Sequence, residues 1–181
     1  MISSYDDIIE RVVTTPIMTA AHEKSMEMGT LRNSVTNGAG NLVGFVGEGL
    51  VHDYLQEQEQ MCGWTNTYDY DIILEGDITI DVKSKRTGFP PKLDYECSIT
   101  ALNTKQKCDV YVFTRVRSDM TVGWILGFLP KSEYFDKATF MEKGTVDSSN
   151  GWKVKSDCYN VPINELRPIH ELIKQNADTC H

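Results

Sequence analysis

The chain lacks the features that define several large classes of protein. It has 181 residues and no run approaching the ~20 apolar residues that a helix needs to cross a bilayer. Residues 1–7 are acidic and lack the basic and then apolar layout of a secretory signal peptide. We therefore expect a cytoplasmic protein that does not act in a membrane. Hydrophobic residues make up 40% and charged residues 24%, which is typical of one globular domain over residues 1–181.

Cysteine is scarce and scattered. The five cysteines form no Cys-x-x-Cys pair, and their number is odd. Neither a structural zinc site nor a disulfide framework is therefore predicted. Free thiols in a reducing compartment are the simpler interpretation.

Basic residues are also in deficit. The 18 lysines and arginines face 26 aspartates and glutamates, which leaves a net charge of −8. This balance argues against a simple phosphate-coating DNA binder, because such proteins usually present a basic surface. It does not exclude an enzyme acting on nucleic acid. A bound metal offsets the charge of clustered carboxylates, and a local group of lysines and arginines can hold the phosphate backbone of the nucleic acid. Two such groups lie within residues 83–92 and 105–107.

Hydrophobic periodicity predicts an α/β fold. A Ser4-x-x-Asp7 pattern before apolar residues predicts a capped helix, and residues 20–28 are compatible with another. Apolar residues at three- and four-residue intervals predict a helix over 42–58. The strands and helices expected beyond it are strands at 68–74, 78–84, 95–99, 109–116, 122–129 and 158–161, a short helix or loop at 100–107 and a helix at 164–175. This order predicts a central mixed sheet with helices on its faces.

Two alternating runs flank a turn-like triplet, residues 75–77, and predict a hairpin. The apolar pattern sets its register: pairing Leu74 with Ile78 places Ile72 opposite Ile80, and one face becomes apolar or aromatic. A slip of one residue would destroy that face.

The other face of this hairpin carries charge. Asp71 would lie opposite Asp81, and Asp69 opposite Lys83. Opposed carboxylates only ~5 Å apart at Cβ repel each other unless a cation neutralises them, and Mg²⁺ prefers oxygen ligands. Lys83 shares a face with Asp81, where an ammonium can orient a metal-bound water or stabilise charge on a phosphate. Taken alone, Asp-x-Lys is equally compatible with a solvent-facing strand edge.

Glu48 is the acid expected upstream of the hairpin. On the predicted helix it lies beside Val51 and Leu55, at the border of the buried face, where an unpaired carboxylate is costly. Its two flanking glycines weaken the helix but allow backbone or substrate to approach closely. A capping or hinge role for Glu48 is the alternative. His52, one turn further on, would touch substrate or Glu48, or be a partly exposed histidine without chemistry.

At these residues the sequence resembles the PD-(D/E)XK nuclease superfamily. The core of that family is a helix carrying an acid, a three-strand meander, a helix and a further strand. The signature is matched by Asp71, nine intervening residues, and then Asp81-Val82-Lys83, and the helix acid is matched by Glu48. The proline that nominally precedes the first aspartate is Tyr70 here. The likeness covers about residues 40–130 and implies a restriction-endonuclease-like core with N-terminal helical and C-terminal accessory segments.

The resemblance also implies roles. Asp71 and Asp81 would bind Mg²⁺ or Mn²⁺ with help from Glu48, and the Val82 carbonyl would be a further ligand. Lys83 would position the water that attacks a phosphodiester in line. DNA is the expected substrate because the superfamily is mostly directed at DNA.

Other assignments stay open. Asp69 is a rival of Asp71, and Lys85 and Lys107 would contact phosphate unless they are ordinary surface lysines. A homodimer on duplex DNA is one arrangement for an acidic chain of this size. The alternative to an enzyme is a catalytically inactive module that binds nucleic acid or protein on the same fold.

Overall fold

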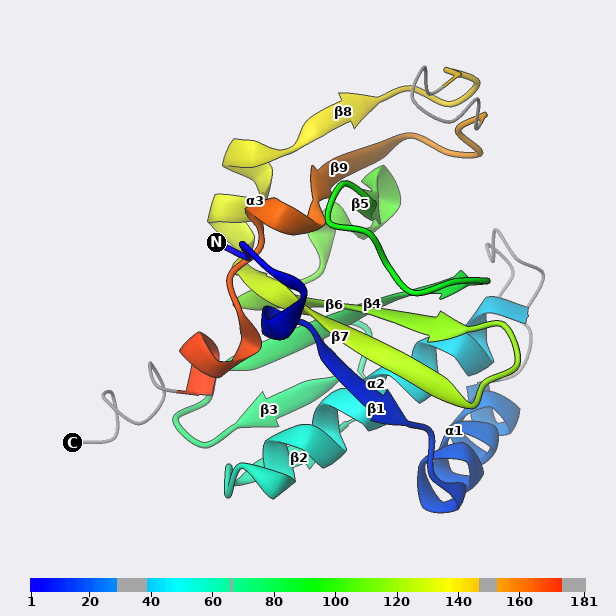
Figure 1. The fold of residues 1–181 in the computed structure, drawn as a ribbon, viewed down its shortest axis with the longest axis vertical. Helices are drawn as coiled ribbons and strands as arrows, with labels where there is room; N and C mark the ends of the chain where they lie inside the picture. The colour runs from blue at the N-terminus through cyan, green and yellow to red at the C-terminus, as the bar shows by residue number, and fades with distance from the viewer. Residues whose placement is uncertain (29–38, 66, 147–152, 174–181) are drawn as a thin grey trace.

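The computed structural model describes residues 1–28, 39–65, 67–146 and 153–173, which form a mixed α/β fold with two sheets (Figure 1). The large sheet contains, in spatial order, β1 (Ile9–Val12), β7 (Val122–Pro130), β6 (Val110–Arg117), β4 (Thr79–Thr87), β3 (Ile72–Leu74) and β2 (Cys62–Trp64). The small antiparallel sheet contains β5 (Glu96–Thr100), β9 (Cys158–Pro162) and β8 (Thr139–Met141). β4 and β6 run parallel, so the large sheet is mixed as predicted.

Helices and short helical turns connect these strands. The α-helices are α1 (Thr15–Met28), α2 (Ala39–Glu57) and α3 (Lys131–Lys137), and the 3₁₀ turns are η1 (Tyr5–Asp7), η2 (Ala101–Lys105) and η3 (Ile163–Glu165). None of the helices in the described ranges is long and apolar enough to cross a membrane.

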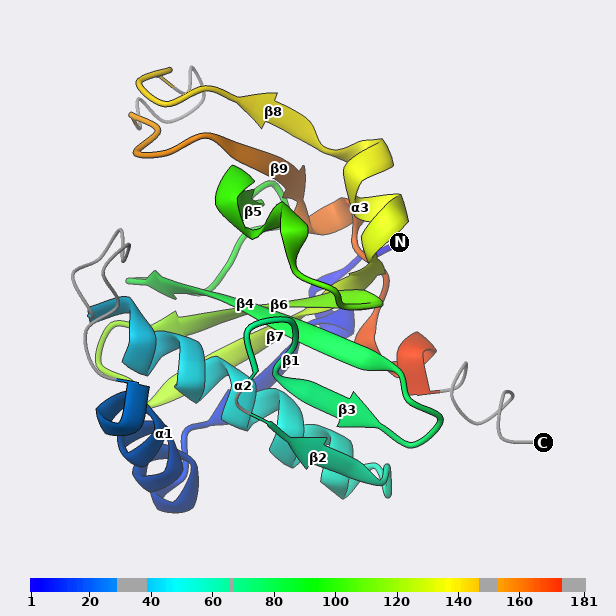
Figure 2. The same ribbon diagram turned by 180° about the vertical axis from the view of Figure 1, so that it is seen from behind.

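The two faces of the large sheet are covered differently. α2 packs on one face, where Val51 and Leu55 meet Ile72, Ile80 and Val112 in one buried cluster. Figures 1 and 2 show α1 and α2 on that side, and α3 with the small sheet on the other. Helices therefore lie on both faces, as expected, but the far face is also covered by a second, small sheet that the sequence did not predict.

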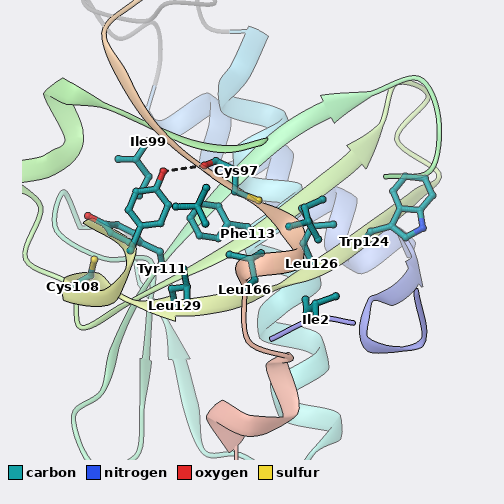
Figure 3. Packing of buried hydrophobic residues seen from close by; sticks show 13 residues of the cluster. Ile2, Cys97, Ile99, Cys108, Tyr111, Phe113, Trp124, Leu126, Leu129 and Leu166 are labelled. Carbon is teal, nitrogen blue, oxygen red and sulfur yellow. Dashed lines mark hydrogen bonds between the residues drawn. The ribbon is translucent and has the colours of Figure 1, made fainter. Parts of the chain in front are cut away.

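The core between the two sheets is rich in aromatic residues. Tyr111 and Phe113 of β6 pack against Tyr134 of α3, with ring centroids 5.5 Å apart in both pairs. The Tyr134 hydroxyl donates to the Cys97 carbonyl oxygen at 2.9 Å. Figure 3 shows Cys97 and Phe113 side by side with Leu126 in this cluster. Packing on this face therefore fixes β5 against the large sheet.

The predicted secondary structure agrees with the structure best where the pattern is long. The helix expected over 42–58 is α2, and the strands expected at 109–116 and 122–129 are β6 and β7. The helix expected at 164–175 is instead η3, Pro168 and a helical stretch over 169–173, and the rest of that prediction lies outside the described residues.

Three predictions are corrected near the N-terminus and in the meander. Ser4 and Asp7 do form a capping box, but it caps only η1, and β1 follows where a helix was expected. The antiparallel meander is β2, β3 and β4, so its first strand was missed. The third strand expected for it, β5, leaves the large sheet and pairs with β9.

The hairpin register is as predicted. Ile72 pairs with Ile80, and the Leu74 N–H donates to the Ile78 carbonyl oxygen at 2.9 Å. The turn contains Gly76 and Asp77 with φ of 85° and 63°. Glycine and aspartate tolerate this left-handed region, which the tight turn needs. Ile72, Leu74 and Ile80 all lie in the apolar cluster under α2.

Candidate active site

The candidate site lies where β3 and β4 separate. The Asp71 N–H still donates to the Ile80 carbonyl oxygen at 2.8 Å, but the next contact across the gap is made by a side chain. Asp71 Oδ2 accepts the Val82 N–H at 2.7 Å. A strand residue directs its N–H and C=O to the same neighbour, so the Val82 carbonyl also faces the Asp71 side. Two oxygens that could bind a metal, those of the Asp71 carboxylate and the Val82 carbonyl, therefore lie on the same side of β4.

Asp81 and Lys83 form the second part of the site. Both side chains leave the same face of β4, and Lys83 Nζ lies 2.5 Å from Asp81 Oδ2. Asp81 is only 2% exposed, and its Oδ2 accepts no hydrogen bond of regular geometry from the described residues. Lys83 Nζ also donates to Gln106 Oε1 at 2.8 Å, and Gln106 Nε2 donates to the Tyr68 carbonyl oxygen at 2.8 Å. The lysine is thus held beside a carboxylate with spare acceptor capacity.

Glu48 approaches the hairpin from α2. It is 7% exposed, so it is more buried than its position at the border of the apolar face suggested. Trp64 Nε1 of β2 donates to Glu48 Oε2 at 2.9 Å. Lys24 of α1 lies over the Trp64 ring, 4.6 Å from its centroid, and donates to the Thr65 carbonyl oxygen at 2.9 Å. Helices α1 and α2 and strand β2 together orient this carboxylate.

The three carboxyl groups influence one another. Burial raises the pKa of Glu48 to about 7, and the Asp81 carboxylate adds to the rise, although the Trp64 hydrogen bond and the Lys24 charge oppose it. Burial also raises the pKa of Asp71 well above its usual range, and repulsion from Glu48 and Asp81 raises it further. Burial is the largest cause of both pKa shifts, and the repulsion among the enclosed acids adds to it. Raised carboxyl pKa values of this kind are common at functional sites.

These donors fit a hard divalent cation. In the described ranges, no three side chains of histidine, cysteine, aspartate or glutamate converge closely enough to enclose a metal by themselves. Mg²⁺ does not require this, since it is usually bound through one or two carboxylates and keeps several water ligands. Asp71, Asp81 and the Val82 carbonyl supply oxygen donors of the right kind, and the buried Asp81 Oδ2 has acceptor capacity left.

Two further predicted residues, Asp69 and His52, contact other parts of the fold. Asp69 Oδ1 accepts the Lys107 backbone N–H at 3.1 Å, so Asp69 braces the loop after η2, whereas its rival Asp71 faces β4. The Lys107 side chain is exposed. His52 packs on Trp64, with ring centroids 5.7 Å apart, and burial lowers its pKa. His52 therefore contacts Trp64, the residue that donates a hydrogen bond to Glu48.

Lys85 is not the surface lysine that its spacing allowed. It lies between the two sheets and donates to the Glu96 carbonyl oxygen at 3.0 Å and to Ser98 Oγ at 2.7 Å. Burial, followed by the nearby Arg115 charge, lowers its pKa.

Sequence reasoning missed three residues that shape the site: Lys24, Trp64 and Gln106. Lys24 and Trp64 come from segments to which no role had been given. Gln106 is a neutral residue between Lys105 and Lys107, and only the charge of its neighbours suggests a role in binding phosphate. The one signal in the sequence was Trp64 itself, a tryptophan just before the polar segment that leads to the predicted hairpin.

No known protein family matches this chain, and no curated protein matches it either. The case for function therefore depends on the geometry of the site.

Proposed function

We propose that the chain is a Mg²⁺- or Mn²⁺-dependent nuclease that hydrolyses phosphodiester bonds of DNA. The proposal is carried by two neighbouring contacts where β3 and β4 separate: Asp71 accepts the Val82 N–H, and Asp81 forms an ion pair with Lys83. The charge of Asp81 raises the pKa of Glu48, and the charge of Glu48 raises that of Asp71.

The order of elements supports a restriction-endonuclease-like core. α2 carries the acid, the antiparallel meander β2–β3–β4 follows, and β6 then adds parallel to β4. The departure lies in the crossover between β4 and β6, which contains β5 and the short η2 rather than a long helix. Under this proposal Glu48 is the helix acid, and Asp71, Asp81 and Lys83 are the acids and the lysine of the meander.

The residues divide the work as follows. Asp71 and Asp81, with the Val82 carbonyl, would hold the cation, which would lower the pKa of a bound water and offset charge on the phosphate. Lys83 Nζ, fixed by Asp81 and Gln106, would position that water for in-line attack and stabilise the charge that develops. Glu48, with a pKa of about 7, can hold or release a proton at neutral pH.

The test is cleavage of plasmid, linear duplex and single-stranded DNA, and of RNA, in Mg²⁺, Mn²⁺ or EDTA. Asp71→Asn should lower the rate by roughly 10³-fold, because several kcal/mol of metal-dependent stabilisation are lost while the amide oxygen can still accept the Val82 N–H. Asp69→Asn is the matched control: the same change two residues away, in a carboxylate that also accepts one backbone N–H.

Metal-dependent cleavage that survives Asp69→Asn and is lost in Asp71→Asn would support the nuclease. Absence of cleavage on every substrate by folded, metal-supplied protein would favour the inactive binding module, which mobility-shift assays in EDTA would then detect.

A further inference from the structure

A second feature of the chain is a cavity of about 260 Å³ between the two sheets. It begins beside Lys83 and extends to Lys85 of β4 and Arg115 of β6. Its apolar side is formed by Cys97 and Phe113, which Figure 3 shows together in the core. The cavity therefore joins the candidate active site to a buried basic region that the nuclease chemistry does not use.

Lys85 and Arg115 lie directly side by side, as partners in the parallel register of β4 and β6. Both donate to the Glu96 carbonyl oxygen, at 3.0 and 3.1 Å, and Lys85 also donates to Ser98 Oγ at 2.7 Å. The Arg115 guanidinium lies 4.9 Å from the centroid of the Tyr95 ring. The protein groups that receive these two cations are thus neutral oxygens and an aromatic face.

The hydrogen bonds of both cations to Glu96 are made to its backbone carbonyl oxygen. Arg115 Nε is buried and has no hydrogen-bond partner within the part of the chain that the structure describes. Burial lowers the pKa of both groups, and for Lys85 the Arg115 charge adds to the effect. Glu96 also lines the cavity, and its carboxylate charge opposes the lowering of the Lys85 pKa. Two partly buried cations beside one carboxylate leave a net positive charge, which an anion in the cavity would offset.

We propose that this cavity binds a phosphate group through Lys85 and Arg115, and that it receives the phosphate adjacent to the one cut at the candidate active site. The second half of this proposal rests on the proposed nuclease function. A guanidinium fork beside an ammonium suits the several oxygens of a phosphate. The polar rim and apolar floor suit the sugar attached to it, and Lys83 links the two sites.

The first experiment measures thermal unfolding in EDTA, so that no turnover is involved. Inorganic phosphate, thymidine 5′-monophosphate and thymidine are titrated separately at constant ionic strength. The wild type is compared with Lys85→Met and with Lys143→Met, which removes one exposed lysine outside the cavity. Phosphate and the monophosphate should raise Tm in the wild type and in Lys143→Met. The affinity of Lys85→Met should be at least roughly tenfold weaker, since a charge-assisted contact is lost.

A structural role for Lys85 makes a different prediction. If Lys85 only ties β4 to β5, Lys85→Met should lower Tm without ligand and leave the phosphate response intact, and that result would overturn the proposal. Equal protection by thymidine and its monophosphate would also overturn it. Arg115→Gln provides an independent variant should Lys85→Met fold poorly, and it should weaken phosphate binding to a similar degree.

A second arm tests the link to the substrate strand, using fluorescence anisotropy of a single-stranded oligothymidylate in EDTA. Binding at least tenfold weaker in Lys85→Met supports the link, whereas unchanged binding overturns it. Phosphate binding without any cleavage activity would leave the pocket standing and refute the nuclease. Cleavage activity together with unchanged phosphate binding in Lys85→Met would support the nuclease and refute the phosphate pocket.

Discussion

At the scale of single residues, Glu48 is a buried acid whose charged form destabilises the folded protein. Its carboxyl group is buried and accepts a hydrogen bond from the neutral Trp64 indole. With a folded pKa of about 7 against an ordinary 4.5, the folded chain binds more protons than the unfolded chain between these pH values. Stability must therefore fall as pH rises through that window.

Glu48→Gln tests this directly, because the glutamine oxygen can still accept the Trp64 N–H. In EDTA, the variant should match the wild type near pH 4.5 and exceed it above pH 7 by on the order of 3 kcal/mol. Urea unfolding at pH 5 and pH 8 gives the two differences. A stability difference that does not change with pH would contradict the raised pKa of Glu48.

The residues that could be predicted are those whose roles follow from local geometry. Asp81 and Lys83 alternate on one strand, and Asp71 follows from the hairpin register, so sequence spacing was enough. Trp64 and Lys24 act through tertiary packing of β2 and α1 against Glu48, which no short-range pattern encodes. Lys85 had the right spacing, but its burial depends on a second sheet that was not expected.

At the scale of elements, α2 approaches the large sheet closely at Gly47. A Cβ added at Gly47 would overlap Ser84 Oγ of β4 and Thr114 Oγ1 of β6, which are hydrogen-bonded to each other at 2.7 Å. Gly47 precedes Glu48, so the approach of this backbone sets the position of the acid.

Gly47→Ala should therefore lower the unfolding free energy by about 1–3 kcal/mol and reduce cleavage, because α2 must move away from β4. Gly44→Ala is the control one turn earlier: its added Cβ meets only Glu48 Oε1, at 4.0 Å. That variant should be neutral or more stable by about 0.5–1 kcal/mol, since alanine favours a helix. Chemical denaturation and initial cleavage rates measure both variants, and equal loss in the two would refute the close-approach argument.

Element prediction succeeded or failed for identifiable reasons. The long amphipathic pattern of α2 and the rich β-forming runs of β6 and β7 were sufficient on their own. β2 and β8 are three residues each, too short for any periodicity. β5 was found as a strand, but its partner β9 lies about sixty residues away, and alternation does not name a partner.

At the scale of the whole molecule, the site should couple metal binding to stability. Metal ligands must be deprotonated to bind, and the raised pKa values of Glu48 and Asp71 make that easier at higher pH. Mn²⁺ at 100 times its Kd should raise Tm by about 5–10 °C at pH 8, and by clearly less at pH 5.5.

Thermal scans with Mn²⁺ and EDTA at the two pH values provide the measurement. Asp69→Asn should retain the shift and Asp71→Asn should lose it. The same Mn²⁺ shift in both variants would place the metal elsewhere on the molecule.

The pairing of β1 with β7 has a consequence for how the chain is made. Ile9 pairs with Ile125, so during synthesis the first strand waits roughly 6–20 s for its partner to leave the ribosome. Its Glu10 and Arg11 later contact Trp124 and the α2 acids Asp53 and Glu57. Charged side chains on an unpaired strand disfavour its pairing with a wrong edge. Glu10 and Arg11, which hold β1 in the folded structure, would therefore also limit aggregation before β7 is made.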